Sequence, residues 1–241
     1  MNKNNLYIFI YASVLVILVA AILSVTATVL KPYQDKNKEI ARKLNILHSV
    51  DKGWDSNQAT SKNDYVEQQY EKYITGSLVV NSKGDSVKGV DAFAIDLEKE
   101  YAKPPEERVL PVFFCAQDDG SKNIILPLRG KGLWGPIWGY ISLQDDFNTI
   151  AGAVFDHSDE TPGLGAEIST RPFQLQFIGK KLFDDEGHFV SVSVNKSNEP
   201  KTEFHSVDAI SGGTITSKGL QKMIADCMTL YLPYIESNKN R

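Results

Sequence analysis

Two adjacent glycines lie between hydroxyl residues in the segment Asp208-Ala209-Ile210-Ser211-Gly212-Gly213-Thr214-Ile215-Thr216-Ser217. The segment follows a strand-like stretch and opens a helical pattern. Glycine permits unusual dihedral angles and close backbone approach, and the first amides of a helix point outward at the positive end of its dipole. Together these features predict a phosphate site. The hydroxyl of Thr214 could also be esterified to such a phosphate.

A second segment that can contact a ligand runs His157-Ser158-Asp159-Glu160-Thr161-Pro162-Gly163-Leu164-Gly165. Proline followed by glycine fits the central positions of a type II turn, and such a loop can present amides and a small apolar surface to a flat ligand. Taken alone, the segment favours the simpler interpretation of an ordinary turn after a strand. His157 and Glu160 match a loose metal-ligand spacing, but no third ligand lies nearby in the sequence, so we predict no metal site.

A third segment combines flexible backbone with large rings: Arg129-Gly130-Lys131-Gly132-Leu133-Trp134-Gly135-Pro136-Ile137-Trp138-Gly139. Exposed tryptophans beside glycines suit a stacking platform or a protein interface. Alternatively, the rings seal the edge of the core. The sequence favours neither interpretation over the other.

The elements that must position these segments follow from the hydrophobic pattern. Helical spacing predicts a helix over 36–50 and a second helix capped by Asp64, with a polar loop over 53–63 between them. The segment 92–101 fits either a strand or a helix, and Pro104-Pro105 ends it. Hairpin signals pair 77–80 with 86–90, 109–116 with 123–128, and 137–143 with 149–157.

The C-terminal part contains fewer hairpin signals. We expect a glycine-rich loop and one short helix over 161–178, and a half-buried strand over 189–194, where apolar and small polar residues alternate. Ser217 is expected to cap a final helix, which Pro233 stops. The apolar stripe of that helix comprises Leu220, Met223, Ile224, Cys227 and Tyr231. Sequential hairpins with helices at both ends predict an α+β domain on an antiparallel sheet.

The N-terminal residues 6–30 carry no charge, and about 20 such residues span a bilayer as a helix. A cleaved signal peptide is the alternative, but its apolar region is usually shorter. We therefore expect a transmembrane anchor over 6–30, a helical linker region over 31–75 and a single domain over 76–241. The positive charges on both sides of the span do not settle its orientation, because long domains translocate largely regardless of charge.

Composition excludes several classes of function. The 241-residue chain has a net charge of −4, which argues against nucleic acid as a partner. It contains neither a P-loop nor a dinucleotide fingerprint, and no catalytic triad suggests itself. Cys115 and Cys227 lie in apolar patterns typical of buried core thiols, although one bridge between them is compatible with an oxidising compartment.

The three glycine-containing segments, in this order, resemble those of the covalent FMN-binding domain family. Asp208 to Thr214 is similar to the motif in which a threonine carries FMN through its phosphate, and Glu160 to Gly165 is similar to the loop that contacts the flavin. Gly132-Leu133-Trp134-Gly135-Pro136-Ile137-Trp138-Gly139-Tyr140 resembles an insertion typical of the C subunit of the Na+-translocating NADH:quinone reductase. One position differs, since Gly213 stands where that family usually has alanine.

The resemblance implies a role for each matching residue. Thr214 would form a phosphoester with FMN, and Ser211, Gly212, Gly213 and Thr216 would surround the phosphate. Thr161, Leu164 and Gly165 would lie along the isoalloxazine, while Glu160 would position their loop. Asp208 would serve recognition by the flavin transferase that installs the cofactor.

The resemblance also implies a membrane-anchored electron-transfer subunit that works with the other subunits of the quinone reductase complex. Its soluble domain would face the periplasm at the bacterial inner membrane. The uncharged span offers no ion path, so this chain would not itself pump sodium. One alternative is the homologous G subunit of an Rnf-type ferredoxin:NAD+ complex, which the Gly-Leu-Trp-Gly stretch disfavours. An alternative from another class is a cofactor-free, membrane-anchored binding module whose threonine loop only caps a helix.

Overall fold

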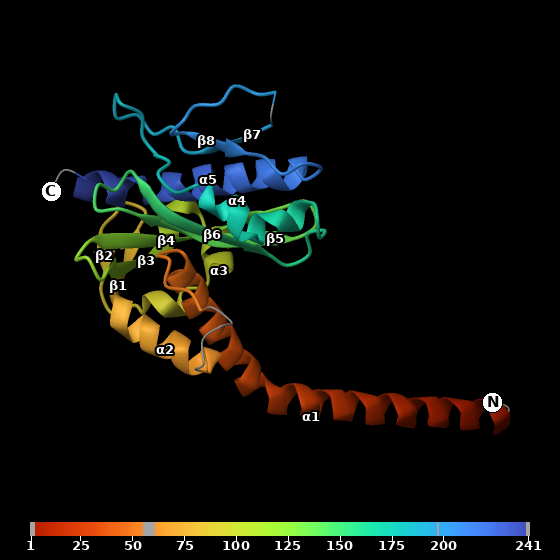
Figure 1. The fold of residues 1–241 in the computed structure, drawn as a ribbon. Coiled ribbons are helices and arrows are strands. Elements are labelled where there is room, and N and C mark those ends of the chain that lie inside the picture. Colours follow the sequence, from red (N-terminus) through yellow and green to blue (C-terminus); the bar gives the residue numbers. More distant parts are fainter. Residues whose placement is uncertain (1–2, 55–60, 197, 240–241) are drawn as a thin grey trace. The chain divides into compact units, whose positions relative to one another are not determined.

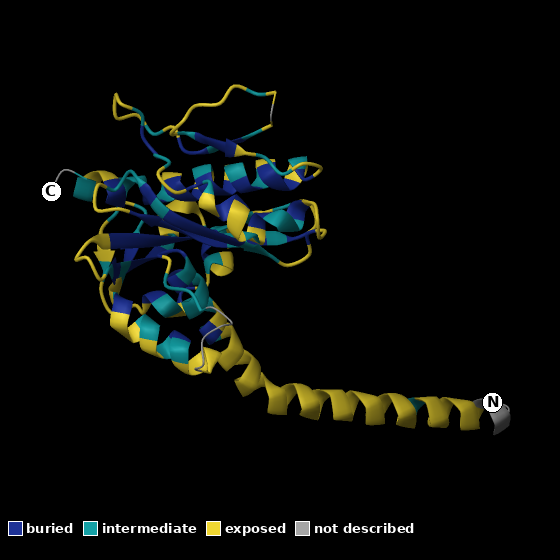
Figure 2. Cartoon of the chain, in the orientation of Figure 1, coloured by how far each residue is buried: buried dark blue, intermediate teal, exposed yellow. Residues whose placement is uncertain are grey.

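The computed structural model describes residues 3–54, 61–196 and 198–239. The chain divides into two compact units, one ending at Arg42 and the other beginning at Lys43. Helix α1 (Lys3–His48) occupies most of the first unit and continues into the second. Figure 2 shows that residues 6–38 of this helix are almost all exposed. Within the described ranges, α1 is the helix that is long and apolar enough to cross a membrane.

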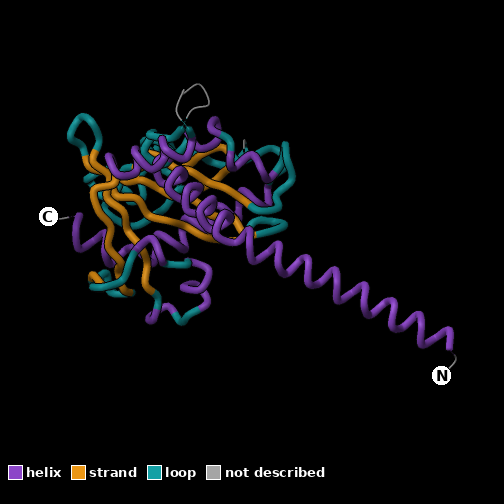
Figure 3. Tube along the Cα trace, turned by 90° about the horizontal axis from the view of Figure 1, so that it is seen from below, coloured by secondary structure: helices purple, strands orange, loops and turns teal. Residues whose placement is uncertain are grey.

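A six-stranded antiparallel sheet organises the second unit, in the order β2-β1-β3-β4-β5-β6 (Figures 1 and 3). All three predicted hairpins are confirmed. The strands are β1 (Ile74–Asn81), β2 (Ser86–Val87), β3 (Val109–Ala116), β4 (Lys122–Lys131), β5 (Pro136–Leu143) and β6 (Ile150–His157). A separate parallel pair, β7 (Ser193–Asn195) with β8 (Ser206–Asp208), was not anticipated from the sequence.

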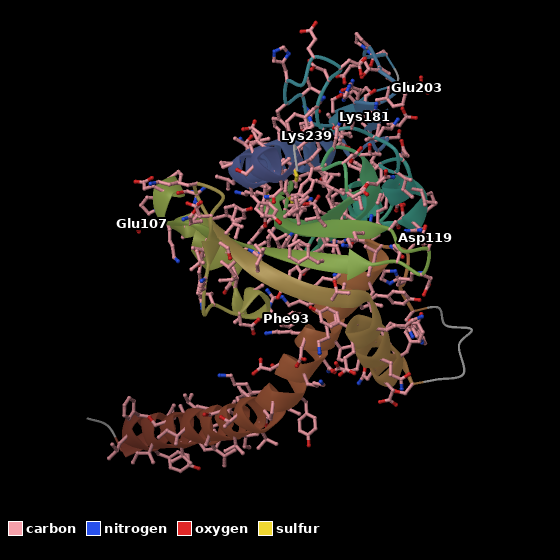
Figure 4. The ribbon with its side chains drawn as sticks, turned by 90° about the vertical axis from the view of Figure 1, so that its left-hand side faces the viewer. Phe93, Glu107, Asp119, Lys181, Glu203 and Lys239 are labelled. Atoms are coloured by element: carbon pink, nitrogen blue, oxygen red, sulfur yellow. The ribbon has the colours of Figure 1, made fainter. Side chains whose placement is uncertain are left out.

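Helices cover both faces of this sheet. Figure 1 shows α5 (Thr214–Lys239) and α4 (Arg171–Leu175) between the sheet and the β7-β8 pair, with α2 (Lys62–Tyr73) on the opposite side. Figure 4 shows the same layers from the side, with Phe93 on one side of the sheet and Lys181 and Lys239 on the other. The shorter helical segments are η1 (Ala92–Ala94), α3 (Leu97–Ala102), η2 (Pro105–Glu107) and η3 (Gly165–Ser169).

The main hydrophobic core lies between α5 and the sheet. The predicted stripe of α5 is confirmed, because all five of its residues are buried in one cluster with Val112, Leu126 and Ile141 of the central strands. Val194 and Val207 of the parallel pair join the same cluster from the other side of α5. Burial of this apolar area fixes the position of α5, and therefore of its N-terminus, against the sheet.

Both predicted ends of α5 are wrong. The helix begins at Thr214 rather than after Ser217, whose hydroxyl instead accepts a hydrogen bond from the amide of Ile210 at 3.1 Å. The helix also continues through Pro233 to Lys239. Proline removes one helical hydrogen bond, but Tyr234 and Ile235 are buried in the core immediately after it. Their packing compensates for the lost bond.

The first predicted helices also begin and end elsewhere. The expected helix over 36–50 is the end of α1, which runs through Pro32 without a break and stops at His48. Helix α2 begins at Lys62, so Asp64 lies in the first turn, where the helix dipole favours a carboxylate, and is not the cap. The expected loop over 53–63 lies partly outside the described residues.

The structure also decides the conformation of the segments 92–101 and 189–194. The segment 92–101 is helical, since the carboxylate of Asp91 accepts a hydrogen bond from the amide of Phe93 to cap η1, and that of Asp96 caps α3. The expected strand over 189–194 is confirmed only at residues 193 and 194, which begin β7. Ser191 has a φ of 60°, which interrupts the extended chain, so that only the short strand β7 forms.

Candidate functional site

The N-terminus of α5 lies directly after a sharp turn of the backbone. Gly212 has a φ of +74°, a left-handed value that favours glycine, and the amide of Gly213 donates to the carbonyl of Ile210 at 3.1 Å. Thr214 then starts the helix with a half-exposed side chain. The amide of Ser217 donates to the carbonyl of Gly213 at 2.9 Å. The amides of residues 214–216 belong to the first turn of α5. Amides in the first turn of a helix have no carbonyl acceptor within the helix.

The segment after β6 forms the predicted type II turn. The amide of Leu164 donates to the carbonyl of Thr161 at 3.1 Å, and Gly163 has a φ of +76° at the third position. Thr161 and Leu164 are exposed, whereas Gly165 is buried. The turn therefore presents a hydroxyl and an apolar side chain to solvent above a buried glycine.

The two glycine segments lie against each other. A Cβ atom added at Gly213 would lie 3.3 Å from the amide nitrogen of Gly165, and one added at Gly212 would lie 2.6 Å from Cδ2 of Leu164. A Cβ atom at Gly213 would also lie 2.9 Å from Cγ2 of Ile210. The glycines thus allow two loops, separated by about 50 residues of sequence, to approach at backbone distance.

Glu160 connects all three sequence segments. The residue is buried, with 5% of its surface exposed. Oε2 accepts a hydrogen bond from the hydroxyl of Thr216 in α5 at 2.5 Å, and Oε1 accepts one from the amide of Trp134 at 2.9 Å. Its own amide donates to Nδ1 of His157 at 3.3 Å, which gives that histidine a structural partner.

These bonds keep Glu160 ionised. Burial acts to raise its pKa, but the hydrogen bonds from Thr216 and from the amides of residues 133–135 outweigh burial, so the net effect lowers the pKa of the carboxyl from its ordinary value of 4.5. An acceptor-only carboxylate matches these donors better than an amide would. We infer from this match that the three loops depend on a charged residue at position 160.

Exposed apolar side chains surround the start of α5. Trp134 is 67% exposed and Ile215 is 60% exposed, and Leu133 and Leu164 also face solvent. Trp134 is therefore available for stacking, whereas Trp138 is half-buried. Sequence reasoning missed Ile215. Its signal was an apolar residue that falls outside the buried stripe of α5.

The arrangement fits a flavin mononucleotide. The exposed turn at Ser211 and Gly212 leads directly into the helix N-terminus, whose amides and dipole suit a phosphate. Leu164, Trp134 and Ile215 provide the apolar surface that a flat ring system needs. The structure brings together the predicted residues Glu160, Gly165, Gly213 and Thr216 with Thr214 at their edge, while Ser211 and Gly212 lie exposed in the preceding turn.

Asp208 lies apart from the Glu160 hydrogen-bond network. Its carboxylate is exposed and pairs with Lys201, and its amide donates to Oε1 of Gln176 at 2.8 Å. An exposed charge at the end of β8 is accessible to another protein.

The two cysteines are buried and free, as expected for core thiols. Burial raises the pKa of Cys115 to about 11. The thiol of Cys227 lies 3.0 Å from the hydroxyl of Tyr101. A bridge between the two cysteines is not formed.

Comparison with known proteins identifies the class of domain. Residues 132–229 match the family profile described as FMN-binding domain. This range contains the 157–165 and 208–217 segments in full and the tryptophan segment from Gly132 onward. The chain thus carries an FMN-binding domain.

Full-length relatives are more specific. The chain is 32% identical over 235 residues to the C subunit of the Na(+)-translocating NADH-quinone reductase of Haemophilus ducreyi, covering 91% of this chain and 88% of that protein. It is 34% identical over 224 residues to the same subunit of Neisseria meningitidis serogroup B, covering 88% and 85%. The crystal structure of the C subunit from Parabacteroides distasonis superposes with a TM-score of 0.76 at 40% identity, over 86% of this chain and 96% of that one. The chain belongs to the family formed by the C subunits of the Na(+)-translocating NADH-quinone reductases.

Proposed function

We propose that this chain is the membrane-anchored electron-transfer subunit of a sodium-translocating NADH:quinone reductase, and that it carries FMN linked through the phosphate to Thr214. The observation that carries the proposal is the position of Thr214. Thr214 is the first residue of α5, and it directly follows two glycines that lie against the other loop, Gly212 against Leu164 and Gly213 against Gly165. The family membership of the chain supports the same cofactor.

The residues of the site have distinct tasks in this proposal. The free amides at the start of α5, with Ser211, Gly212 and Gly213, bind the phosphate. Glu160 holds the Thr161–Gly165 loop, the Trp134 loop and α5 in fixed positions through the bonds described above. The exposed side chains of Leu164 and Trp134 orient the ring and exclude water from its face. Together they restrict the cofactor to one position.

Attachment requires one covalent step. The oxygen of Thr214 forms a bond to phosphorus and loses its proton, while the group that was bound to that phosphorus leaves. A flavin transferase supplies the activated flavin donor, and the exposed carboxylate of Asp208 is available for its recognition. The bound flavin supplies one- and two-electron redox chemistry, whereas the protein supplies position and electrostatics.

The membrane setting of the proposal rests on α1. A span over residues 6–30 anchors the chain in the bacterial inner membrane, and residues 76–241 form the FMN-binding domain on the periplasmic side. Long domains cross a membrane largely regardless of flanking charge, so the basic residues after the span are compatible with this orientation. The other subunits of the complex supply and remove the electrons.

Flavin fluorescence after denaturation tests the proposal. The chain is produced in cells with and without a flavin transferase, separated on a denaturing gel and viewed under ultraviolet light. We expect a fluorescent band that depends on the transferase. A dark band in both samples would favour the cofactor-free binding module. Copurification with ferredoxin-dependent rather than quinone reductase subunits would instead assign the chain to an Rnf-type complex.

A further inference from the structure

A cleft of about 530 Å³ lies at the end of the sheet where β1 begins, β3 ends and β4 begins. The turn that joins β3 to β4 is marked by Asp119 in Figure 4. Its lining includes Gly76, Phe114, Cys115, Asn123, Ile124 and Phe147. Pockets that bind small molecules in proteins have volumes of about 300–1,000 Å³. The cleft is therefore large enough for a ligand of one or two rings.

The backbone of β1 keeps the cleft open. The register of β1 against β3 shifts between Ile74 and Gly76, and an atom added at the Cβ position of Gly76 would have Cδ2 of Phe114 as its nearest neighbour, at 4.0 Å. The bulge and the missing side chain thus leave space that an ordinary strand residue would fill. Protein interiors are normally close-packed, and β-bulges are frequent next to sites.

A second backbone irregularity lies at Phe147, which also lines the cleft. Phe147 has a φ of 55°, which is unfavourable for a bulky residue. Its ring lines the cleft and packs edge-on against Tyr234, with 6.2 Å between the ring centroids. The core holds this ring, together with that of Phe114, against the cleft. The two aromatic rings are preorganised for contact with another ring.

The polar groups of the cleft restrict the class of ligand. Ile124 supplies a buried apolar side chain on the same face of the sheet as Phe114, and the buried residue Cys115 follows Phe114 in β3. The side chain of Asn123 is occupied, since it accepts from Gln117 at 3.0 Å and donates to the carbonyl of Leu143 at 3.4 Å. The charges of the lining are those of exposed Lys122 and Asp145, and they cancel. An uncharged aromatic body with one hydroxyl or carbonyl at the rim matches this lining.

The cleft is separate from the proposed flavin site. Tyr234, which packs against Phe147, lies 20 residues along α5 from Thr214, or roughly 30 Å at the helical rise of 1.5 Å per residue. We propose that this cleft is a second binding site, which takes a small uncharged aromatic molecule between Phe114 and Phe147. It does not depend on the identity of the cofactor at Thr214.

Thiol labelling in the full chain tests the site locally. Gly76→Cys places a thiol in the cleft, whereas the matched control Ser77→Cys places one at the next, exposed position of β1. The native thiols are buried and label slowly. With 1-naphthol as the ligand, the rate of maleimide labelling of Gly76→Cys should fall by a factor of 1 + [ligand]/Kd. At a ligand concentration of four times Kd this factor is about five. Labelling of Ser77→Cys should not change.

Partition of 1-naphthol into detergent or lipid affects the labelling of both variants equally. Only the difference between the slowing of Gly76→Cys and that of Ser77→Cys therefore reports binding in the cleft. A second reporter, Lys122→Cys at the rim, should show the same protection, and adding Gly76→Leu to it should remove that protection by filling the cleft. Equal slowing of Gly76→Cys and Ser77→Cys, or no slowing up to the solubility limit of 1-naphthol, would overturn the proposal.

Discussion

The hydroxyl of Thr216 donates a 2.5 Å hydrogen bond to the buried carboxylate of Glu160, which joins the first turn of α5 to the loop after β6. The other oxygen of the same carboxylate accepts a hydrogen bond from the amide of Trp134. One ionised group therefore connects the first turn of α5, which begins at Thr214, with the loop after β6 and the Trp134 loop. Because these bonds hold the pKa of Glu160 low, the charge persists at neutral pH.

The first prediction concerns replacement of that charge. Glu160→Gln replaces one of the two carboxylate oxygens with an NH2 group, which cannot accept a hydrogen bond. Either the hydroxyl of Thr216 or the amide of Trp134 therefore loses its acceptor at a buried position. We expect a loss of about 1–3 kcal/mol in the free energy of unfolding, measured by urea denaturation at neutral pH. The neighbouring control Asp159→Asn lies on the surface and should change stability by less than about 0.5 kcal/mol.

The same variant gives a defined pH dependence. The folded pKa of Glu160 lies below 4.5, so its carboxylate contributes fully above that pH, and the contribution disappears as the pH falls through the folded pKa. The stability difference between the native chain and Glu160→Gln should therefore shrink below pH 4.5. A difference that is constant across this range would contradict the role assigned to the carboxylate.

The second prediction concerns the close approach at Gly165. A Cβ atom there would lie 2.3 Å from Oε2 of Glu160 and 2.4 Å from Oγ1 of Thr216, so Gly165→Ala must separate the two groups. We expect a destabilisation of about 1–3 kcal/mol and reduced flavin attachment. Gly76→Ala is the matched control, because the nearest atom to its Cβ position is 4.0 Å away. Equal effects of the two substitutions would exclude the steric explanation.

The third prediction concerns the glycine that precedes Thr214. In this chain a Cβ atom at Gly213 meets Cγ2 of Ile210 at 2.9 Å, so alanine requires Ile210 to move. Gly213→Ala alone should lower stability by about 1–2 kcal/mol, and adding Ile210→Ala should remove the penalty of the first substitution. Thermal unfolding of the single and double variants measures this coupling. Simple additivity of the two effects would show that the contact is not limiting.

The fourth prediction separates recognition by the flavin transferase from folding. The Asp208–Lys201 pair is exposed, and such pairs contribute about 1 kcal/mol or less to stability. Asp208→Asn should therefore slow flavin attachment without a measurable change in melting temperature. Lys201→Ala removes the same ion pair and keeps the carboxylate, so it should leave the attachment rate intact. A slow rate in both variants would assign the effect to the pair rather than to recognition.

Much of the fold could be predicted because it follows from local patterns. Alternation and turn residues give the three hairpins, and the stripe through Leu220 and Tyr231 gives α5. The Pro162-Gly163 turn is likewise encoded by its own two residues. Patterns within single helices and single hairpins carried these predictions.

The failures share a different cause. The helix continues through Pro233 because Tyr234 and Ile235 pack in the core, and it starts at Thr214 because Gly213 and Ile210 close a turn before it. The link between Glu160 and Thr216 spans 56 residues. Tertiary contacts decide the passage through Pro233 and the link from Glu160 to Thr216, and a single sequence does not display them. The helix start depends on a local turn whose geometry the sequence pattern did not reveal.

The attachment of FMN to Thr214 is tested most directly by tandem mass spectrometry of the protein made together with the flavin transferase. A proteolytic peptide that covers residues 208–217 should carry one FMN, and fragmentation should place it on Thr214. Thr214→Ala should yield only the unmodified peptide and a dark band on a denaturing gel, while Thr216→Val should still carry flavin on Thr214. FMN found on Ser211 or Thr216, or retained after Thr214→Ala, would contradict the account.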